Sequence, residues 1–188
     1  MPTRAEHRRT TLLRLHDAAL SSFEADGPGV TIDTIAERAG VSRRTVFRYV
    51  DRKEELAFVH PMLWFDVFER GLADAPASPL GERLRFASRA IALHIDADPE
   101  PPRRAFLVTL AHPELAVGFH SVFQSWVDRV AAEVEVATDD PFRARIVGAA
   151  IMGMVDAVTR AWVAGGPSAS FTDLYDEAFA MVAPVIEG

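Results

Sequence analysis

Apolar residues recur at three- and four-residue steps along almost the whole chain, which is the spacing of one face of an α-helix. No segment alternates apolar and polar residues for long enough to suggest a β-strand. The first helix is expected to carry Leu12, Leu15, Ala19 and Phe23 on one face and to end at the Asp-Gly-Pro-Gly cluster of residues 26–29. The pattern predicts an all-α protein of about nine helices.

Two short helices joined by a tight turn are expected next. Thr31 can cap a helix that Gly40 ends, and Ser42 can cap another that reaches about Tyr49. Asp51 is expected to cap a fourth helix, which runs on through the apolar residues of 56–67. Because glycine permits a sharp turn between two helices, residues 31–56 have the sequence pattern of a helix-turn-helix.

Five further helices are expected beyond a linker at residues 74–81 that contains alanine and proline. Pro99, Pro101 and Pro102 are expected to break the chain before a short helix, and Pro113 and Pro141 suit the first turns of two longer ones. The expected helices cover approximately residues 84–98, 103–111, 113–130, 141–165 and 171–186.

Composition excludes several classes of protein. The 188 residues include 49% apolar side chains, which can form a core, and no cysteine, so a disulfide framework, a thiolate metal site and a thiol nucleophile are excluded. The N-terminal segment is polar and basic, and Asp156 and Arg160 interrupt the most apolar run, so we expect neither a signal peptide nor a membrane span. A cytoplasmic location fits this composition best.

The charge is distributed unevenly along the chain. The net charge is -7, yet residues 1–55 hold ten basic and nine acidic side chains, and the remaining ten and eighteen lie beyond them. Five bases lie within eleven positions of the helix-turn-helix, and a solvated charged face remains an alternative to a nucleic-acid contact there. They are Arg43, Arg44, Arg48, Arg52 and Lys53.

The side chains expected on the exposed side of the second short helix can bind duplex DNA. Arginine can pair with guanine O6 and N7 in the major groove, while hydroxyl groups and lysine can hold phosphates. The segment A-G-V-S-R-R-T-V-F-R-Y, followed by K-E-E-L, resembles the DNA-binding domain of the TetR family of bacterial repressors. The resemblance implies a homodimer that binds a palindromic double-stranded DNA operator and releases it when a small-molecule effector binds the larger helical body.

The resemblance also implies roles for individual residues. Arg43, Arg44 and Arg48 match positions that face base edges, and Thr31, Thr45, Tyr49 and Lys53 match positions that contact phosphates. Two departures are expected to weaken binding: Phe47 replaces a frequent tyrosine, and Asp33 places an acid where a base would help. The tail with Arg4, Arg8 and Arg9 could compensate if it enters a minor groove.

Aromatic residues beyond the helix-turn-helix suggest an apolar effector site, although ordinary core packing accounts for any one of them. His112-Pro113-Glu114-Leu115 and a helical tryptophan are weakly similar to a TetR subfamily with acyl-CoA-like ligands. The candidate ligand-binding residues are Trp64, Phe68, Phe106, Phe119, Phe123 and Trp126.

Small residues at 148–157 suggest close packing of the last two helices. In the TetR family these helices form the dimer interface, and packing within one chain is the alternative. Neither a metal site nor a cofactor site is expected, because His94, Asp96 and Asp98 lack the spacing of a shared helix face. No catalytic motif indicates an enzyme, and a hydrolase would need a nucleophile that is not evident.

These patterns together favour a DNA-binding transcriptional regulator, most simply a repressor. Residues 1–55 are expected to form a three-helix DNA-binding domain, and residues 56–188 a larger ligand-binding and dimerisation domain. The alternative from another class is an all-helical protein-interaction module with a vestigial DNA-binding head.

Overall fold

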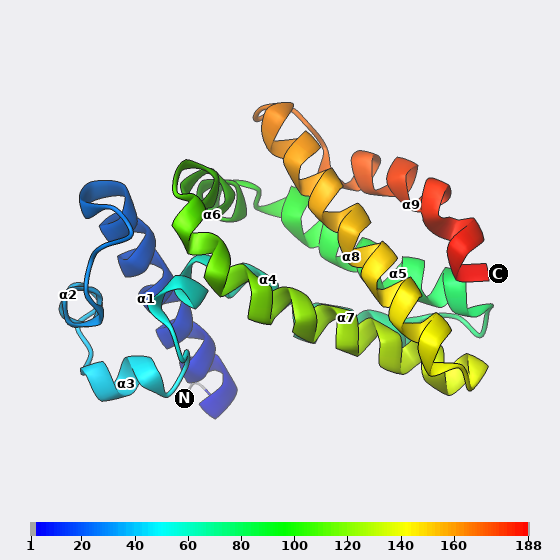
Figure 1. Ribbon diagram of the computed structural model, residues 1–188, viewed down its shortest axis with the longest axis horizontal. Helices are drawn as coiled ribbons and strands as arrows, with labels where there is room; N and C mark the ends of the chain where they lie inside the picture. Colours follow the sequence, from blue (N-terminus) through cyan, green and yellow to red (C-terminus); the bar gives the residue numbers. More distant parts are fainter. Residues whose placement is uncertain (1–2, 188) are drawn as a thin grey trace. The chain divides into compact units, whose positions relative to one another are not determined.

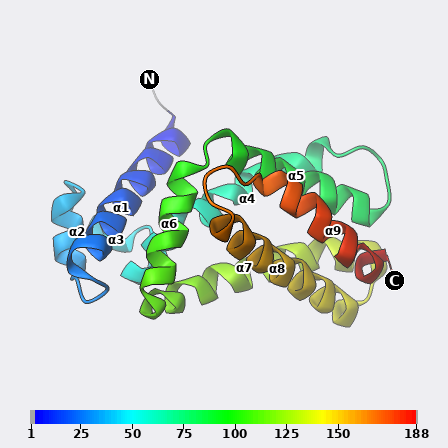
Figure 2. The ribbon, with the colours of Figure 1, turned by 90° about the horizontal axis from the view of Figure 1, so that it is seen from above.

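Every regular element in the computed structural model, which describes residues 3–187, is a helix, so the all-α prediction is confirmed (Figures 1 and 2). The α-helices are α1 (Arg4–Asp26), α2 (Ile32–Arg38), α3 (Arg43–Phe47), α4 (Val59–Asp74), α5 (Leu80–Ala97), α6 (Glu100–Ala111), α7 (Ala116–Thr138), α8 (Pro141–Ala164) and α9 (Phe171–Glu187). Two short 3-10 helices, η1 (Lys53–Phe58) and η2 (Pro113–Leu115), precede α4 and α7.

The chain packs as two compact units. One extends to Leu63 and includes Pro102–Val122, and the other comprises Trp64–Pro101 and the chain from Phe123 onward. Helices α4 and α7 therefore contribute residues to both units. The functional boundary expected between residues 55 and 56 stays a prediction, because these units describe packing and not activity.

Helix α1 carries the core of the first unit. Leu15, Ala19 and Phe23, which follow the spacing expected from the sequence, are completely buried. Helix α2 and the 3-10 helix η1 pack against α1, and Phe58 of η1 lies 5.3 Å from Phe119 at the start of α7. The long first helix thus supports the short elements that follow it.

Three expectations about helix starts are wrong. Asp51 caps no helix: η1 begins after Arg52 without a side-chain cap, and the carboxylate of Glu55 accepts the backbone N–H of Asp51. Pro101 and Pro102 do not precede α6 but lie in its first turn, where a helix has no use for their missing N–H groups. Pro113 opens η2 and not the α-helix itself.

Helix α9 organises the second unit, because it packs against both α5 and α8 (Figure 1). The Asp96 carboxylate, at the end of α5, accepts the backbone N–H groups of Phe171 and Thr172 at 2.7 and 2.9 Å. Trp162 of α8 and Tyr175 of α9 are almost completely buried. Asp96 therefore holds the N-terminus of α9.

Helix α8 is long and apolar enough to cross a membrane, with a mean hydropathy of 1.5 over its most apolar window. A buried helix of a folded domain has the same composition, and 44% of this window is buried inside the structure. Asp156 and Arg160, which interrupt the window, form an ion pair at 2.8 Å. Packing within the second unit therefore buries part of the apolar surface of α8.

Candidate nucleic-acid interface

The helix-turn-helix predicted from the sequence is present at α2 and α3. The Thr31 and Ser42 hydroxyls accept the backbone N–H groups of Thr34 and Thr45, each at 3.2 Å, so both predicted N-caps are confirmed. Gly40 has a φ of 64°, a left-handed conformation that glycine adopts without strain. Ile35 and Val46 are completely buried and lock the two helices together.

The outer side of α3 is exposed, as the DNA-reading assignment requires. Arg43, Arg44 and Arg48 all belong to the exposed residues, although α3 ends at Phe47 and Arg48 already lies in the turn that follows. The Arg43 guanidinium donates to Asp33 at 3.0 Å and lies 5.5 Å from the centre of the Phe47 ring. Asp33, which was expected only to oppose DNA binding, therefore has a specific partner in Arg43.

Two guanidinium groups lie close to the Tyr49 ring. Arg8 and Arg48 are 5.8 and 5.1 Å from the centre of its ring, and Arg48 also donates to the Tyr49 hydroxyl at 3.3 Å. Arg8 belongs to α1, so the first helix brings a base to the end of α3. Arg4 and Arg9 are helical as well, and this part of the chain is therefore not an extended arm of the kind that enters a minor groove.

The other candidate phosphate contacts have structural partners. The Thr45 hydroxyl lies 2.9 Å from that of Ser42, and the Thr31 hydroxyl lies 3.0 Å from that of Thr34. The Lys53 ammonium donates to the Pro28 carbonyl at 2.8 Å and pairs with Glu54 at 3.3 Å. Lys53 thus ties η1 to the loop after α1.

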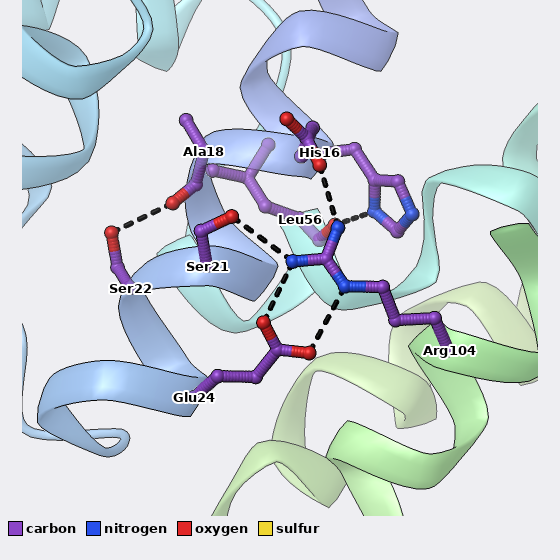
Figure 3. Close-up of polar contacts among 8 residues, drawn as sticks. His16, Ala18, Ser21, Ser22, Glu24, Leu56 and Arg104 are labelled. Atoms are coloured by element: carbon purple, nitrogen blue, oxygen red, sulfur yellow. Dashed lines mark hydrogen bonds and ion pairs between the residues drawn. The ribbon is translucent and has the colours of Figure 1, made fainter.

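A single arginine of α6 fastens that helix to α1 (Figure 3). Arg104 donates to Asp17 at 2.6 Å, to Ser21 at 3.0 Å and to both carboxylate oxygens of Glu24 at 2.7 and 3.0 Å. These hydrogen bonds from Arg104 lower the pKa of Glu24. Asp17, Ser21 and Glu24 are spaced as neighbours on one helix face, so α6 grips α1 over two turns.

His16 connects α1 to η1 on the inner side of α1. It is 4% exposed, its Nδ1 lies 2.6 Å from the Leu56 carbonyl, and its ring meets that of His60 edge to face at 4.8 Å. Because a carbonyl only accepts, Nδ1 carries the proton in this pair. Burial lowers the pKa of His16, so the neutral ring is favoured.

The candidate ligand residues belong to both units. Phe106 and Phe119 are in the first, while Trp64, Phe68, Phe123 and Trp126 are in the second. Trp126 stacks on Phe65 at 4.0 Å and meets Phe68 edge to face at 5.5 Å. Trp126 is 5% exposed and packs α7 against α4, as the core-packing alternative requires.

Comparison with known proteins identifies a family for most of the chain. Residues 15–58 match the family described as bacterial regulatory proteins, tetR family, and residues 78–187, more than half of the chain, match the MftR C-terminal domain. The chain belongs to the TetR family. The first match covers the second half of α1, the helix-turn-helix and η1.

One relative within the TetR family is from Mycobacterium tuberculosis strain H37Rv. It is provisionally named the mycofactocin biosynthesis transcriptional regulator MftR, and it is 31% identical over 134 residues. The matched segment spans 66% of this chain and 64% of that protein. The likeness therefore does not extend over the full relative.

Solved TetR-like structures share the fold. A regulator from Pseudomonas aeruginosa PAO1 has a TM-score of 0.63 at 16% identity, covering 99% of this chain and 93% of its own. The FadR repressor of Thermus thermophilus, solved with lauroyl-CoA, has a TM-score of 0.59 at 21% identity and covers 92% of this chain and 93% of its own. The FadR regulator of Bacillus subtilis, solved with stearoyl-CoA, has a TM-score of 0.57 at 15% identity and covers 91% of this chain and 97% of its own. At these identities the likeness establishes the fold alone.

The buried His16 predicts a loss of stability in mild acid. Because its pKa is lowered from 6.5 in the folded protein, the unfolded chain takes up the proton first as the pH falls through 6.5. The free energy of unfolding should then decrease, by at most about 1.4 kcal/mol per pH unit, until the pH reaches the folded pKa. Urea unfolding at pH 7.5, 6.5 and 5.5 measures this slope.

The substitution His16→Asn keeps an N–H donor for the Leu56 carbonyl but removes the titration, so its slope should be smaller than that of the wild type. His7→Asn on the exposed side of α1 is the matched control and should keep the wild-type slope. Equal slopes for the wild type and His16→Asn would show that another group governs the pH dependence.

Proposed function

We propose that the protein is a transcriptional regulator that binds a palindromic DNA operator as a homodimer and releases it when an apolar effector binds. The observation that carries the proposal is the exposed row of Arg43, Arg44 and Arg48 on and just after α3, held on a capped helix-turn-helix. A guanidinium on such a helix can pair with guanine in the major groove. Family membership supports the same function and, with the fold, favours a repressor over an enzyme.

Arg44 and Arg48 are the base-reading residues of this proposal, with Arg43 beside them. Tyr49, Thr31, Thr45 and Lys53 would hold phosphates. Lys53 can keep its bond to the Pro28 carbonyl while it contacts a phosphate, because an ammonium has three N–H donors. The Arg8 guanidinium, stacked on Tyr49, adds a further positive charge to this side.

A DNA titration tests the proposal with duplexes that the protein itself selects from a random pool. The wild type should bind a selected duplex more tightly than random duplex, with an affinity that falls steeply as salt rises. Arg44→Ala and Arg48→Ala should each cost about 1 to 3 kcal/mol on the selected duplex and less on random duplex, because a base contact is lost. Fluorescence anisotropy at two salt concentrations measures both.

Arg70→Ala, on an exposed position of α4, is the matched control and should leave both affinities unchanged. Weak, salt-insensitive and equal binding to the two duplexes by the wild type would overturn the DNA-binding function. It would favour the alternative of an all-helical interaction module.

The homodimer is proposed on the outward side of α8 and α9. The small residues of α8 divide into two sets: an added Cβ at Gly148 would lie 2.7 Å from the Val127 carbonyl of α7, while Gly153 has open space around it. Gly148 therefore packs within the chain. The open side also carries exposed apolar residues, which suits a twofold helical interface. These are Phe142, Ile146, Ala149, Ala157, Met181 and Val185.

Gly153→Arg should separate the dimer without unfolding the subunit. The position has room for a side chain, and arginine favours a helix over glycine, but a charge would be buried if a second copy covers this side. Sedimentation analysis should show monomers for Gly153→Arg and dimers for the wild type. Ala132→Arg, on an exposed position of α7, is the control and should stay dimeric. Dimers of Gly153→Arg would place the interface elsewhere.

The effector is proposed to be an apolar molecule of the acyl-CoA type. Support comes from the aromatic side chains of α4 and α7 and from two FadR structures of the same fold with lauroyl-CoA and stearoyl-CoA. An effector of this kind would act by binding one conformation better than another, and it can change DNA affinity only by that ratio. Trp126 is the candidate chosen for a test, because it packs against the aromatic rings of Phe65 and Phe68.

Lauroyl-CoA should quench tryptophan fluorescence saturably, whereas coenzyme A without the acyl chain should not. Trp126→Phe should weaken lauroyl-CoA binding by about tenfold, equivalent to 1.4 kcal/mol, if Trp126 contacts the chain. Trp162→Phe replaces another buried tryptophan of the second unit and should leave the affinity unchanged. Equal effects of the two substitutions would show that Trp126 is ordinary core, and no saturable quenching would exclude lauroyl-CoA as a ligand.

A further inference from the structure

The first residue of α3 is held by two neighbours. The Arg43 guanidinium donates to Asp33, in the first turn of α2, at 3.0 Å, and it lies 5.5 Å from the centre of the Phe47 ring one turn further along α3. The side chains of Arg43 and Asp33 are 61% and 64% exposed, so the pair lies on the outer surface of the helix-turn-helix. An aromatic ring and a carboxylate together fix the direction of the guanidinium.

A pair exposed to this degree contributes little to folding stability, typically less than about 1 kcal/mol. Asp33 has a separate structural use, because a carboxylate in the first turn of α2 interacts favourably with the helix dipole. That use requires no partner in α3, since Thr31 already caps α2. The orientation of Arg43 by Asp33 therefore calls for a role beyond stability.

The carboxylate changes what Arg43 can bind. A guanidinium has five N–H donors, so Arg43 can keep its bond to Asp33 and still offer donors to a base. A DNA phosphate that approaches the same guanidinium meets the negative charge of Asp33 as well. Asp33 therefore opposes phosphate binding by Arg43 more than it opposes base recognition, and the two kinds of contact differ in their sequence dependence.

We propose that Asp33 is a specificity-determining positioning residue, which holds Arg43 for base recognition and screens it from phosphates on random DNA. The proposal rests on the DNA-binding function proposed above. Asp33, which departs from the family pattern, then has a function of its own. It lowers the affinity for non-cognate DNA and so raises the ratio of cognate to random binding.

The test compares Asp33→Asn with Glu37→Gln on random duplex and on a duplex selected by the wild type. Glu37 is an exposed acid one turn further along α2, so both variants remove one negative charge from the same helix. Asp33→Asn frees Arg43 to contact one additional phosphate, which should steepen the dependence of log K on log salt by about 0.9. At 0.1 M salt this corresponds to about an eightfold gain in affinity for random duplex.

The gain on the selected duplex should be smaller, so the specificity ratio of Asp33→Asn should fall, whereas Glu37→Gln should leave the slope and the ratio near the wild-type values. Equal changes in the two variants would overturn the proposal, because any acid near DNA would then act alike. Circular dichroism checks that both variants keep the helical content of the wild type.

The double variant Asp33→Asn with Arg43→Ala tests whether Asp33 acts through Arg43. On random duplex it should bind like Arg43→Ala alone, because the released guanidinium is gone. A persistent eightfold gain would mean that Asp33 repels DNA directly, and the positioning role would be wrong. If the wild type shows no salt-dependent binding to either duplex, the DNA-binding function itself is overturned. The two failures are therefore distinguishable.

Discussion

Helices α2 and α3 have only seven and five residues, and helices this short do not persist alone in water. Their existence depends on packing in series: α3 packs against α2, and α2 packs against the 23-residue helix α1. Ile35 and Val46 are completely buried in this arrangement, so the hydrophobic contacts of two small helices are concentrated in very few side chains. The direction in which α3 presents its arginines therefore depends on α2 and, through α2, on α1.

Helix α1 is itself held by residues that are distant in sequence. Arg104 of α6 binds three side chains of α1, and His16 of α1 meets the carbonyl of Leu56, forty residues further along. The N–H groups of Arg104 are matched by carboxylates and a hydroxyl, which makes the orientation of α6 against α1 specific as well as stable. Helix α6 is therefore bound to the same helix against which α2 and η1 pack.

Local patterns were enough to predict most of this fold. The caps at Thr31 and Ser42 involve partners three residues away, so the sequence contains all the information that they need. The wrong assignment at Asp51 has a local cause too, because Glu55 competes by accepting the Asp51 N–H. Pro101 and Pro102 were misplaced because proline is compatible with both a break and a first helical turn.

The contacts of the candidate site were much less predictable. Periodicity and residue type placed Arg43, Arg44 and Arg48 on one side of a short helix, but nothing local indicated that Asp33 would pair with Arg43. The partners of Lys53 and Arg104 depend on how distant segments meet, 25 and about 80 residues apart along the chain. The sequence also offered no reason to distinguish Gly148 from Gly153, whereas the structure shows that Gly148 packs against α7 and Gly153 faces open space.

The arrangement of charge is consistent with the DNA-binding surface proposed for an acidic protein. The net charge of -7 gives no general attraction to a polyanion, so binding depends on a few cations in fixed positions. Arg43 is oriented by Asp33 and Phe47, and Arg8 and Arg48 are oriented by Tyr49. Side chains that are already ordered lose less conformational entropy on binding. The proposed surface would therefore favour a DNA sequence that matches the fixed guanidinium groups, because it has little excess positive charge with which to hold any other sequence.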